Sequence, residues 1–473
     1  MKWWARAVGL LAVTALVVAA VAAGSEPTAH AQSRLGARPS AIPAGIHKIR
    51  HVVIIMQENR SFDNYFGTYP HADGIPGYAG HPGKVPCIPD PGEPCVHPFH
   101  DRHDYNAGGP HGSGSASQDV DGGKMDGFIA QQEAILKHCK CVSRPADDAV
   151  GFHTGAEIPN YWTYARDFVL QDHMFQPDFS WSLPAHLYLV SLWSAHCTIM
   201  GDPRSCTSSV DNPGPPPGWG RHPTSTPPNY AWTDLTYLLF KHHVGWRYYI
   251  FRGIEPDCES DLALTCAPRT QGPQTSPVWS PLPWFTTVRK DHQLGNVESL
   301  NAFFTAVQNG TLPAVSWIMP NREVSEHPFI SRISRGQTYV TGLVNTIMQS
   351  REWKSTAIFI AWDDWSGFYD NVRPPQVDGE GYGLRVPALM ISPYARRGYI
   401  DHQTLSFDAY AKFIEDDFLG GQRIDPSTDG RPDPRPDVRE NQRQLGNLIR
   451  EFNFSQTPRK PVLLPVHPKT DFR

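Results

Sequence analysis

Two polar side chains at the end of an apolar run give the first sign of chemistry in this sequence. Residues 51–56 are mostly apolar and β-branched, and Glu58 and Asn59 follow almost at once. The run predicts a strand buried on both faces of a sheet. A carboxylate beside a carboxamide at the end of such a strand offers the oxygen ligands that a hard cation prefers. Taken alone, this pattern is more often a strand that runs into a polar loop.

A second apolar run ends in the same way. Residues 356–362 predict another buried strand, and Asp363 and Asp364 come directly after it. Adjacent carboxylates repel each other unless a cation or a proton lies between them. Because ligands collect at the carboxyl ends of strands in open α/β sheets, we expect Glu58, Asn59 and these two aspartates on one rim. An all-oxygen set of this kind suits one hard or borderline divalent ion, whose identity the sequence does not specify.

A serine before a helical pattern provides a candidate nucleophile. Ser182 precedes Leu183 and Pro184, and apolar residues then recur with helical spacing. Serine at the N-cap with proline just inside the helix is ordinary capping chemistry, and this is the plainer interpretation. The same geometry presents the positive end of a helix to an anion. A serine there can attack phosphorus if a metal ion lowers its pKa.

Two histidines lie in turns that can reach such a site. His111 belongs to a glycine-rich turn over residues 108–113, and His327 follows Glu326 and precedes a proline. Each histidine alone is more often a solvated loop residue. Adjacent side chains need not touch, so the Glu326–His327 sequence does not by itself indicate an acid–base pair.

Strand and helix patterns alternate along the chain. Further strand candidates and helix candidates follow in turn over residues 123–139 (helix), 167–170 (strand), 246–251 (strand), 314–319 (strand), 337–348 (helix), 386–391 (strand) and 408–418 (helix). This alternation predicts an α/β sandwich with a mostly parallel central sheet and helices on both faces.

The N-terminus has the features of an export signal. A basic start, an apolar run over residues 7–23 and an Ala-His-Ala site ending at Ala31 predict a signal peptide over residues 1–31. We therefore expect a secreted or extracytoplasmic protein, with a flexible segment over residues 32–45. An uncleaved anchor is the alternative, because the apolar run is long for a signal.

Eight cysteines and 45 prolines accompany this export signal. The cysteines fall in close pairs, which predicts long Pro-rich loops pinned by disulfides in an oxidising compartment. Cys139 and Cys141 are close for a mutual bond, so they have the alternative of reaching Cys87 and Cys95. A cysteine zinc site lacks the usual CxxC pairs. The net charge of −5 gives no basic footprint for nucleic acid.

Four ordered motifs in this chain resemble the bacterial secreted phosphoesterase family, which holds non-haemolytic phospholipases C and acid phosphatases. The motifs are residues 57–63 (QENRSFD), residues 182–184 (SLP), residues 325–328 (SEHP) and residues 362–370 (WDDWSGFYD). The resemblance runs from about residue 46 to residue 420. It implies an alkaline-phosphatase-like α/β core, one metal ion, and a serine or threonine nucleophile.

The resemblance also implies roles for particular residues. The metal would be held by Glu58, Asn59, Asp363, Asp364 and Ser182, and Ser182 would also be the nucleophile. The phosphoryl oxygens or the leaving group would meet His111, His327 and the nearby Glu326. We expect the carboxylates to converge within about 5 Å of the Ser182 hydroxyl, close enough to share one ion.

The chain departs from the family pattern in three places. Asn371 stands where many relatives have histidine, Ala185 and His186 replace a commoner Asn-Arg, and residues 406–408 replace the usual Asp-His-Thr. These departures leave the expected metal and nucleophile positions intact but weaken any inference about substrate. The expected organisation is a phosphoesterase domain over residues 46–422 and a C-terminal extension over residues 423–473.

The expected activity is two-step phosphoryl transfer through a phosphoserine, acting on a phosphate ester or a phospholipid. Phospholipase C and acid phosphatase both stay open, as do transient contact with a membrane surface and the oligomeric state. Protonated His111 or His327 would help most at mildly acidic pH. A sulfatase of the same fold is one alternative, based on a near-miss motif from Cys266 to Arg269. A catalytically inactive secreted binding protein is the other.

Overall fold

The structure is a computed structural model that describes residues 42–139, 146–211, 213–214, 227–257, 267–275 and 278–473. The described residues belong to one compact unit, Ile42–Arg473. The signal peptide expected over residues 1–31 lies outside the described residues. Within the described part of the chain, no helix has the length and apolar character needed to cross a bilayer.

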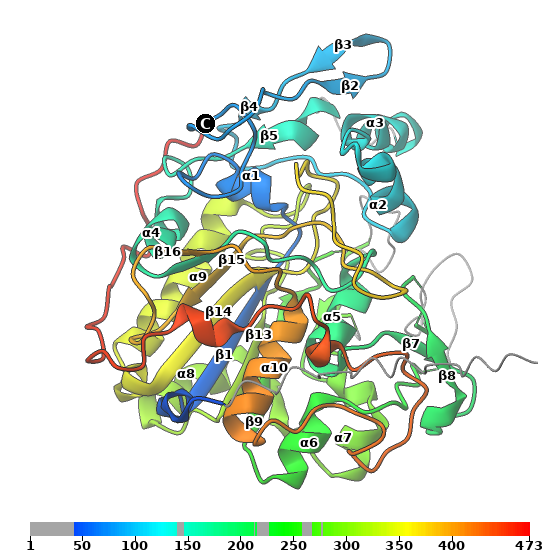
Figure 1. Ribbon diagram of the computed structural model, residues 1–473, viewed down its shortest axis with the longest axis vertical. Helices are drawn as coiled ribbons and strands as arrows, with labels where there is room; N and C mark the ends of the chain where they lie inside the picture. Colours follow the sequence, from blue (N-terminus) through cyan, green and yellow to red (C-terminus); the bar gives the residue numbers. More distant parts are fainter. Residues whose placement is uncertain (1–41, 140–145, 212, 215–226, 258–266, 276–277) are drawn as a thin grey trace, which may run out of the picture. The chain divides into compact units, whose positions relative to one another are not determined.

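The described chain is organised around one eight-stranded sheet (Figure 1). Across the sheet the strands run in the order β12 (Val297–Ser299), β9 (Trp246–Ile250), β13 (Val315–Met319), β1 (His51–Gln57), β14 (Thr356–Trp362), β15 (Ala388–Ile391), β6 (Val169–Gln171) and β16 (Tyr399–Asp401). Neighbouring strands are parallel except at β15, which is antiparallel to both β14 and β6. The expected α/β architecture with a mostly parallel sheet is confirmed.

The two apolar runs of the sequence form adjacent central strands. β1 pairs with β14 in parallel over its whole length, so that Gln57 lies opposite Trp362. Both strands are almost fully buried, because helices cover the two faces of the sheet and β-branched side chains pack well there. The matched register means that the residues after Gln57 and Trp362 leave the sheet at the same level.

Helices lie on both faces of this sheet, as expected (Figure 1). Contacts between elements group α4 (Pro159–Asp167), α8 (Leu300–Asn309) and α9 (Ile333–Met348) together, and likewise α5 (Ser182–Ser191), α6 (Leu235–Lys241), α7 (Thr286–Lys290) and α10 (Phe407–Phe418). Beyond the carboxyl end of β1 lie α1 (Phe62–Phe66), α2 (Ser113–Val120) and α3 (Phe128–Cys139).

Two sequence expectations about elements need correction. The strand expected over residues 386–391 is β15, whose antiparallel direction places Ser392 at the opposite edge of the sheet from the ends of β1 and β14. The helix expected from residue 123 begins only at Phe128. Gly123 and Met125 have φ values of 105° and 58°, which a right-handed helix cannot contain.

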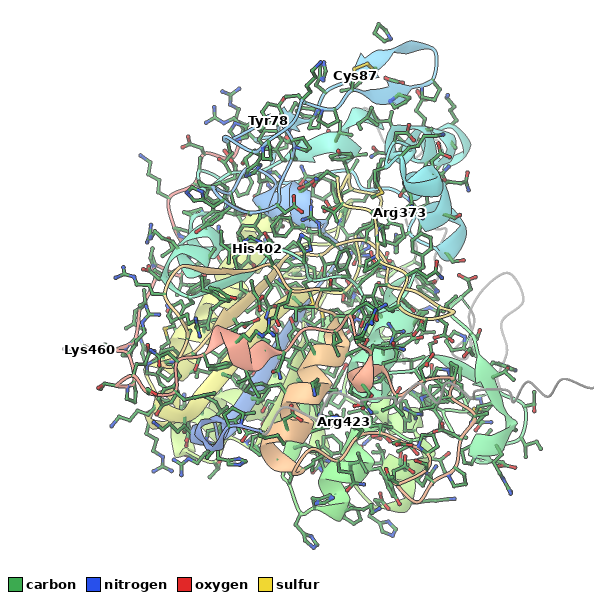
Figure 2. The ribbon with its side chains drawn as sticks, viewed as in Figure 1. Tyr78, Cys87, Arg373, His402, Arg423 and Lys460 are labelled. Atoms are coloured by element: carbon green, nitrogen blue, oxygen red, sulfur yellow. A yellow bond between two sulfur atoms is a disulfide. The ribbon has the colours of Figure 1, made fainter. Side chains whose placement is uncertain are left out.

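Two disulfides pin loops in the described chain. Cys87–Cys95 closes the hairpin of β2 (Ile88–Asp90) and β3 (Glu93–Val96), and Cys197–Cys206 joins β7 (Ala195–Cys197) to β8 (Cys206–Ser208). Figure 2 shows the first of these at Cys87, far from the sheet. Because Cys87 and Cys95 bond to each other, the alternative pairing with Cys139 and Cys141 is excluded. Cys141, Cys258 and Cys266 lie outside the described residues.

The C-terminal segment, residues 423–473, packs on the rest of the unit. The Arg439 guanidinium lies 3.0 Å from the Asp408 carboxylate of α10, and both residues are buried. Phe452 stacks on Phe413 of the same helix with ring centroids 5.2 Å apart. The segment therefore contributes buried charge and apolar surface to the core around α10.

Candidate active site

The ends of β1 and β14 are joined by hydrogen bonds from Asn59. Its backbone N–H donates to Asp363 Oδ1 at 3.1 Å, and its amide donates to both Asp364 oxygens at 2.9 and 3.0 Å. Asn59 has a φ of 50°, a left-handed conformation that asparagine tolerates better than most residues. The sharp turn at this position brings the first expected motif onto the second.

Ser182 meets the same carboxylate from a third element. Its hydroxyl donates to Asp364 Oδ2 at 3.0 Å. Ser182 is the first residue of α5, and the N-cap position belongs to Trp181, so the capping role expected for Ser182 is wrong. The hydroxyl is bound to the site and not to the backbone of its own helix. The structure therefore brings together Ser182, Asn59 and Asp364 as the family resemblance implies.

Three buried carboxylate oxygens next to this group lack donors. Both oxygens of Glu58 and Asp363 Oδ2 have no hydrogen-bond partner among the described residues. His186 Nε2 lies 3.3 Å from Asp363 Oδ2 and 3.7 Å from Glu58 Oε1, and it also lacks a hydrogen bond. All three side chains are fully buried. Ligand atoms that converge without pairing to one another fit a bound cation.

Sequence reasoning missed His186 as a member of this site. The signal was its spacing, because His186 is four residues after Ser182 and lies on the same face of α5 one turn further on. It had been noted only as a departure from the family pattern. Its imidazole changes the expected all-oxygen donor set into one with a nitrogen, which shifts the preference towards a borderline ion.

The electrostatics of these carboxylates call for a positive charge. Burial raises the pKa of Glu58 well above its usual range, and the charges of Asp363 and Asp364 raise it further. Burial, together with Asp363, raises the pKa of Asp364 to about 8 despite the opposing effect of His111. A divalent cation held among these groups would remove the penalty, so the residues present fit the metal that the family implies.

The two expected histidines both contact Asp257, a residue that the sequence did not indicate. Asp257 Oδ2 lies 3.3 Å from His111 Nε2 and 3.1 Å from His327 Nε2, and all three side chains are buried. Asp257 lies shortly after β10 (Gly253–Ile254), in a loop whose composition carries no recognisable motif. Only the packing of this loop against the histidine turns could reveal it.

This second cluster carries strongly interacting charges. Burial lowers the pKa of His111, but Asp364 and Asp257 outweigh it and raise that pKa to about 10. The two histidines lower the pKa of Asp257 against the effect of burial. A pKa of about 10 keeps His111 charged through neutral pH, so its protonation does not by itself favour an optimum in mild acid.

Glu326 has a different set of partners from the one expected. Its carboxylate accepts hydrogen bonds from the hydroxyls of Tyr65 and Tyr161, each at 2.5 Å, and from the indole of Trp362 at 3.2 Å. Burial raises its pKa to about 7. These bonds tie the residue before His327 to the residue before Asp363. In the described structure the Glu326 carboxylate therefore links the two loops through these three hydrogen bonds.

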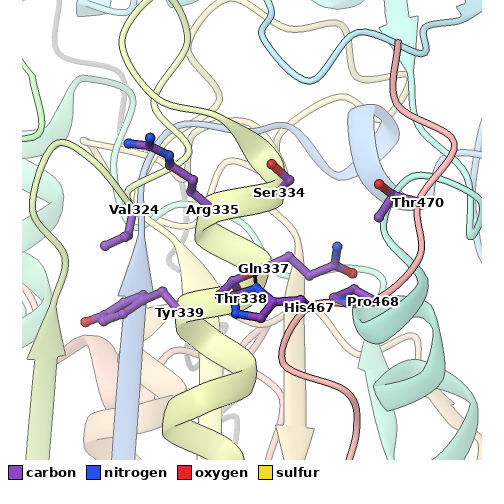
Figure 3. A pocket seen from close by; sticks show the side chains of 9 residues that line it. All are labelled: Val324, Ser334, Arg335, Gln337, Thr338, Tyr339, His467, Pro468 and Thr470. Carbon is purple, nitrogen blue, oxygen red and sulfur yellow. Dashed lines mark hydrogen bonds between the residues drawn. The ribbon is translucent and has the colours of Figure 1, made fainter.

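The surface pocket in Figure 3 does not coincide with these residues. It lies at α9 and the C-terminal segment, where Thr338 lies next to His467, and the side chains of Arg335 and Tyr339 extend on the side of Val324. None of the expected site residues lines it. The chemistry is concentrated instead in the buried groups at the ends of β1 and β14.

Comparison with known families assigns this fold and site to a class. The sequence profile of the Phosphoesterase family matches residues 49–419. The chain belongs to this family, and its enzyme class is that of the phosphoric ester hydrolases. The expected family is confirmed, and the matched range contains both strand ends, Ser182, Asp257 and the two histidines.

Several curated relatives are phospholipases C. Phospholipase C B of Mycobacterium tuberculosis is 25% identical over 90% of this chain and 82% of its own length. The non-hemolytic phospholipase C of Burkholderia pseudomallei is 27% identical over 88% of this chain and 61% of its own length. Non-specific phospholipase C1 of Arabidopsis thaliana is 23% identical over 75% of this chain and 62% of its own length.

Solved structures give a weaker likeness. The PsFucS1 sulfatase from Pseudoalteromonas sp. aligns over 84% of this chain and 73% of its own, with 11% identity and a TM-score of 0.36. The sulfatase alternative from the sequence depended on Cys266, which lies outside the described residues.

Proposed function

We propose that this chain is a metal-dependent phosphoesterase that hydrolyses phospholipid-type phosphodiesters through a phosphoserine on Ser182. The observation that carries the proposal is the hydrogen bond from the Ser182 hydroxyl to Asp364, within a buried group of carboxylates that lack donors. A merely structural serine at the start of α5 would cap its own helix.

The first step is attack by Ser182 on phosphorus. The bond from Ser182 Oγ to phosphorus forms as the bond to the leaving alcohol oxygen breaks, and the serine proton passes to Asp364. Asp364 Oδ2 already accepts a hydrogen bond from the Ser182 hydroxyl at 3.0 Å, which places it to take the proton. The free backbone N–H groups at the start of α5 would donate to the phosphoryl oxygens.

A divalent cation held by Glu58, Asn59, Asp363 and His186, with Ser182 and Asp364 beside it, would supply positive charge that favours the serine alkoxide. The chain's own groups orient that serine. Asn59 fixes Asp364 through two hydrogen bonds, and the matched ends of β1 and β14 fix Glu58 against Asp363.

The second step restores the serine. The departing alcohol oxygen takes a proton from the imidazole on its side, His111 or His327. Water then attacks phosphorus from the side that the alcohol has left and gives a proton back to that imidazole, while the bond to Ser182 Oγ breaks and Asp364 returns its proton to the serine oxygen. We propose that His111 and His327 serve the phosphoryl oxygens or the leaving-group side. This proposal is supported by the contacts of both histidines with Asp257. The charge of Asp257 also acts on Glu58, which supports a position of the histidines beside the metal group.

The proposed substrate is a phospholipid or a related phosphodiester, because the curated relatives carry phospholipase C names. We also propose an extracytoplasmic location after cleavage behind Ala31, which the two disulfides support. The N-terminal sequence of the exported protein tests this cleavage directly.

A substrate panel with the purified mature protein tests the activity. It compares phosphatidylcholine, p-nitrophenyl phosphate and p-nitrophenyl phosphocholine, each with and without a chelator. We expect the diesters to be preferred and the chelator to abolish turnover. Preference for the monoester would favour an acid phosphatase instead.

The variant Ser182→Ala tests the nucleophile. We expect kcat to fall at least roughly 1,000-fold, because the attacking oxygen is lost. Ser191→Ala is the matched control at the other end of α5, since its hydroxyl donates to the Leu187 and Trp193 carbonyls and accepts from the Trp232 indole, away from the site. Wild-type turnover in Ser182→Ala would rule out the phosphoserine.

A further inference from the structure

Three buried groups outside the expected metal set face one another without hydrogen bonds. His111 Nε2, His327 Nε2 and both oxygens of Asp257 lack hydrogen-bond partners among the described residues, although each Nε2 lies within 3.3 Å of Asp257 Oδ2. The exposed fraction of each side chain is 3% or less. Buried polar groups without partners are costly, so such a cluster needs an explanation.

The other nitrogen of each ring fixes its tautomer. His327 Nδ1 lies 2.7 Å from the Pro328 carbonyl oxygen, and His111 Nδ1 lies 3.3 Å from that of Gly109. A carbonyl can only accept, so each Nδ1 carries a hydrogen and donates it. A cation displaces the Nε2 proton of an imidazolium, and each Nε2 then offers a lone pair beside the Asp257 carboxylate, the arrangement in which histidines bind metals.

The distances fit three ligands of one ion. Donor atoms at 2.0–2.1 Å from a tetrahedral ion lie about 3.3 Å from one another. The separations here are 3.1 and 3.3 Å, and the three ligand atoms lie within 4.8 Å of one another. Direct N–H···O bonds would instead align the Nε2 hydrogens with Asp257, and that alignment is absent among these three residues.

We propose that His111, Asp257 and His327 form a second cation site, distinct from the one at Glu58, Asp363 and His186. Two imidazoles and one carboxylate, with a fourth position open, are the donor set of a catalytic zinc-type ion. The role of this second site depends on the proposed function, because the two imidazoles would act on the leaving oxygen through the ion that they hold.

The position of the second site supports that role. The charge of Asp364 acts on His111, and that of Asp257 acts on Glu58, so the two clusters face each other. The loop that carries His327 is also bound to β1, because the Glu58 N–H donates to the Ser325 carbonyl at 2.9 Å. Two cations on either side of one phosphoryl group are a known arrangement for in-line displacement.

Metal content of the full chain tests the site without using activity. Protein stripped with a chelator is loaded with Zn²⁺, passed through a desalting column and assayed for bound metal. We expect two ions per wild-type chain and one in His327→Ala or Asp257→Ala, with zinc affinity at the lost site lowered more than 100-fold. Asp363→Asn should retain the His327 site and lose the other ion.

A matched control separates a built site from any histidine–aspartate pair. His402 Nδ1 lies 2.7 Å from Asp172, and among the described residues this pair belongs to no group of three potential metal ligands. Figure 2 labels His402. His402→Ala should keep two ions per chain. Circular dichroism checks that each variant is folded.

Cobalt gives an independent signal. Co²⁺ loaded in place of zinc should produce a visible absorption band in the wild type that disappears in His327→Ala and persists in Asp363→Asn.

One ion per wild-type chain, unchanged in His327→Ala, would overturn the proposal and identify the cluster as a direct imidazolium–carboxylate pair. Wild-type turnover of phosphodiesters with one ion would refute only the second site. Two bound ions without activity on any phosphate ester would refute only the function.

Discussion

The carboxylates in this site differ in whether their oxygens accept hydrogen bonds. Glu58 and Asp363 have oxygens without donors, whereas Asp364 receives hydrogen bonds from Asn59 and Ser182. The two kinds of carboxylate therefore have different tasks, although sequence reasoning grouped them as equal ligands. The free oxygens are available to a cation, and the bonded ones orient the nucleophile.

A buried carboxylate outside the site shows the cost of burial without a cation. Asp119 is fully buried, with one hydrogen bond from the Trp365 indole at 2.8 Å, and burial raises its pKa well above the usual range. As pH rises above about 4, the unfolded chain loses this proton first. The free energy of unfolding of the wild type therefore falls over that range.

We expect Asp119→Asn to remove this pH dependence. The variant should match the wild type near pH 4 and have the higher free energy of unfolding at pH 8, measured by urea denaturation at both values. Asp121→Asn is the control, because Asp121 is exposed and Lys124 lowers its pKa. The free energy of unfolding of this control should not exceed that of the wild type at pH 8. Equal free energies of unfolding for the wild type and Asp119→Asn at both pH values would refute the prediction.

At the scale of elements, α9 packs closely against the loop that carries His327. A Cβ atom on Gly336 would lie 2.0 Å from Glu326 Cγ, and Tyr65 and Tyr161 hold the Glu326 carboxylate so that it cannot move aside. Glycine is required at this helical position by close approach and not by its backbone angles.

We expect Gly336→Ala to lower the free energy of unfolding by about 1–3 kcal/mol, because overpacking outweighs the better helix propensity of alanine. Gly342→Ala is the matched control on the same helix, where a Cβ would meet nothing within 4 Å. The free energy of unfolding of that variant should rise by up to about 1 kcal/mol. Thermal and urea unfolding measure both, and equal gains would show that Glu326 is free to move.

At the scale of the whole unit, the C-terminal segment belongs to the core. Arg439 and Arg435 are buried in it, and the Arg435 guanidinium donates to the carbonyls of Ser191 and Thr233. The segment was expected as an extension that packs on the domain or trails from it. Its contacts with α5 and α10 stabilise the helices that cover one face of the sheet.

A chain that ends at Gln422 should therefore fail to unfold cooperatively, because it exposes the α10 surface and leaves Asp408 without its cation. The control ends at Val466 and loses mainly exposed contacts such as that between Arg102 and Asp471. Differential scanning calorimetry should show a single transition for the control and none for the shorter chain. A normal transition in the shorter chain would make residues 423–473 a separate extension.

The sequence alone determined the scaffold and half of the site. β1 and β14 were predictable because long β-branched runs have few alternatives to a buried strand, and the polar residues after them had to lie at its end. The family motifs gave Ser182, Glu58, Asn59 and the aspartate pair. The mostly parallel sheet followed from the alternation of strands and helices.

The tertiary structure decided which groups face one another. His186 and Asp257 joined the site because helix α5 and the loop after β10 fold against the strand ends. The spacing from Ser182 puts His186 on the same face of α5, but only the fold brings that face to Asp363. Tyr65, Tyr161 and Trp362 converge on the Glu326 carboxylate, a set of partners that the sequence did not indicate. Secondary structure depends on neighbours in the chain, whereas the role of a buried charge depends on partners hundreds of residues away.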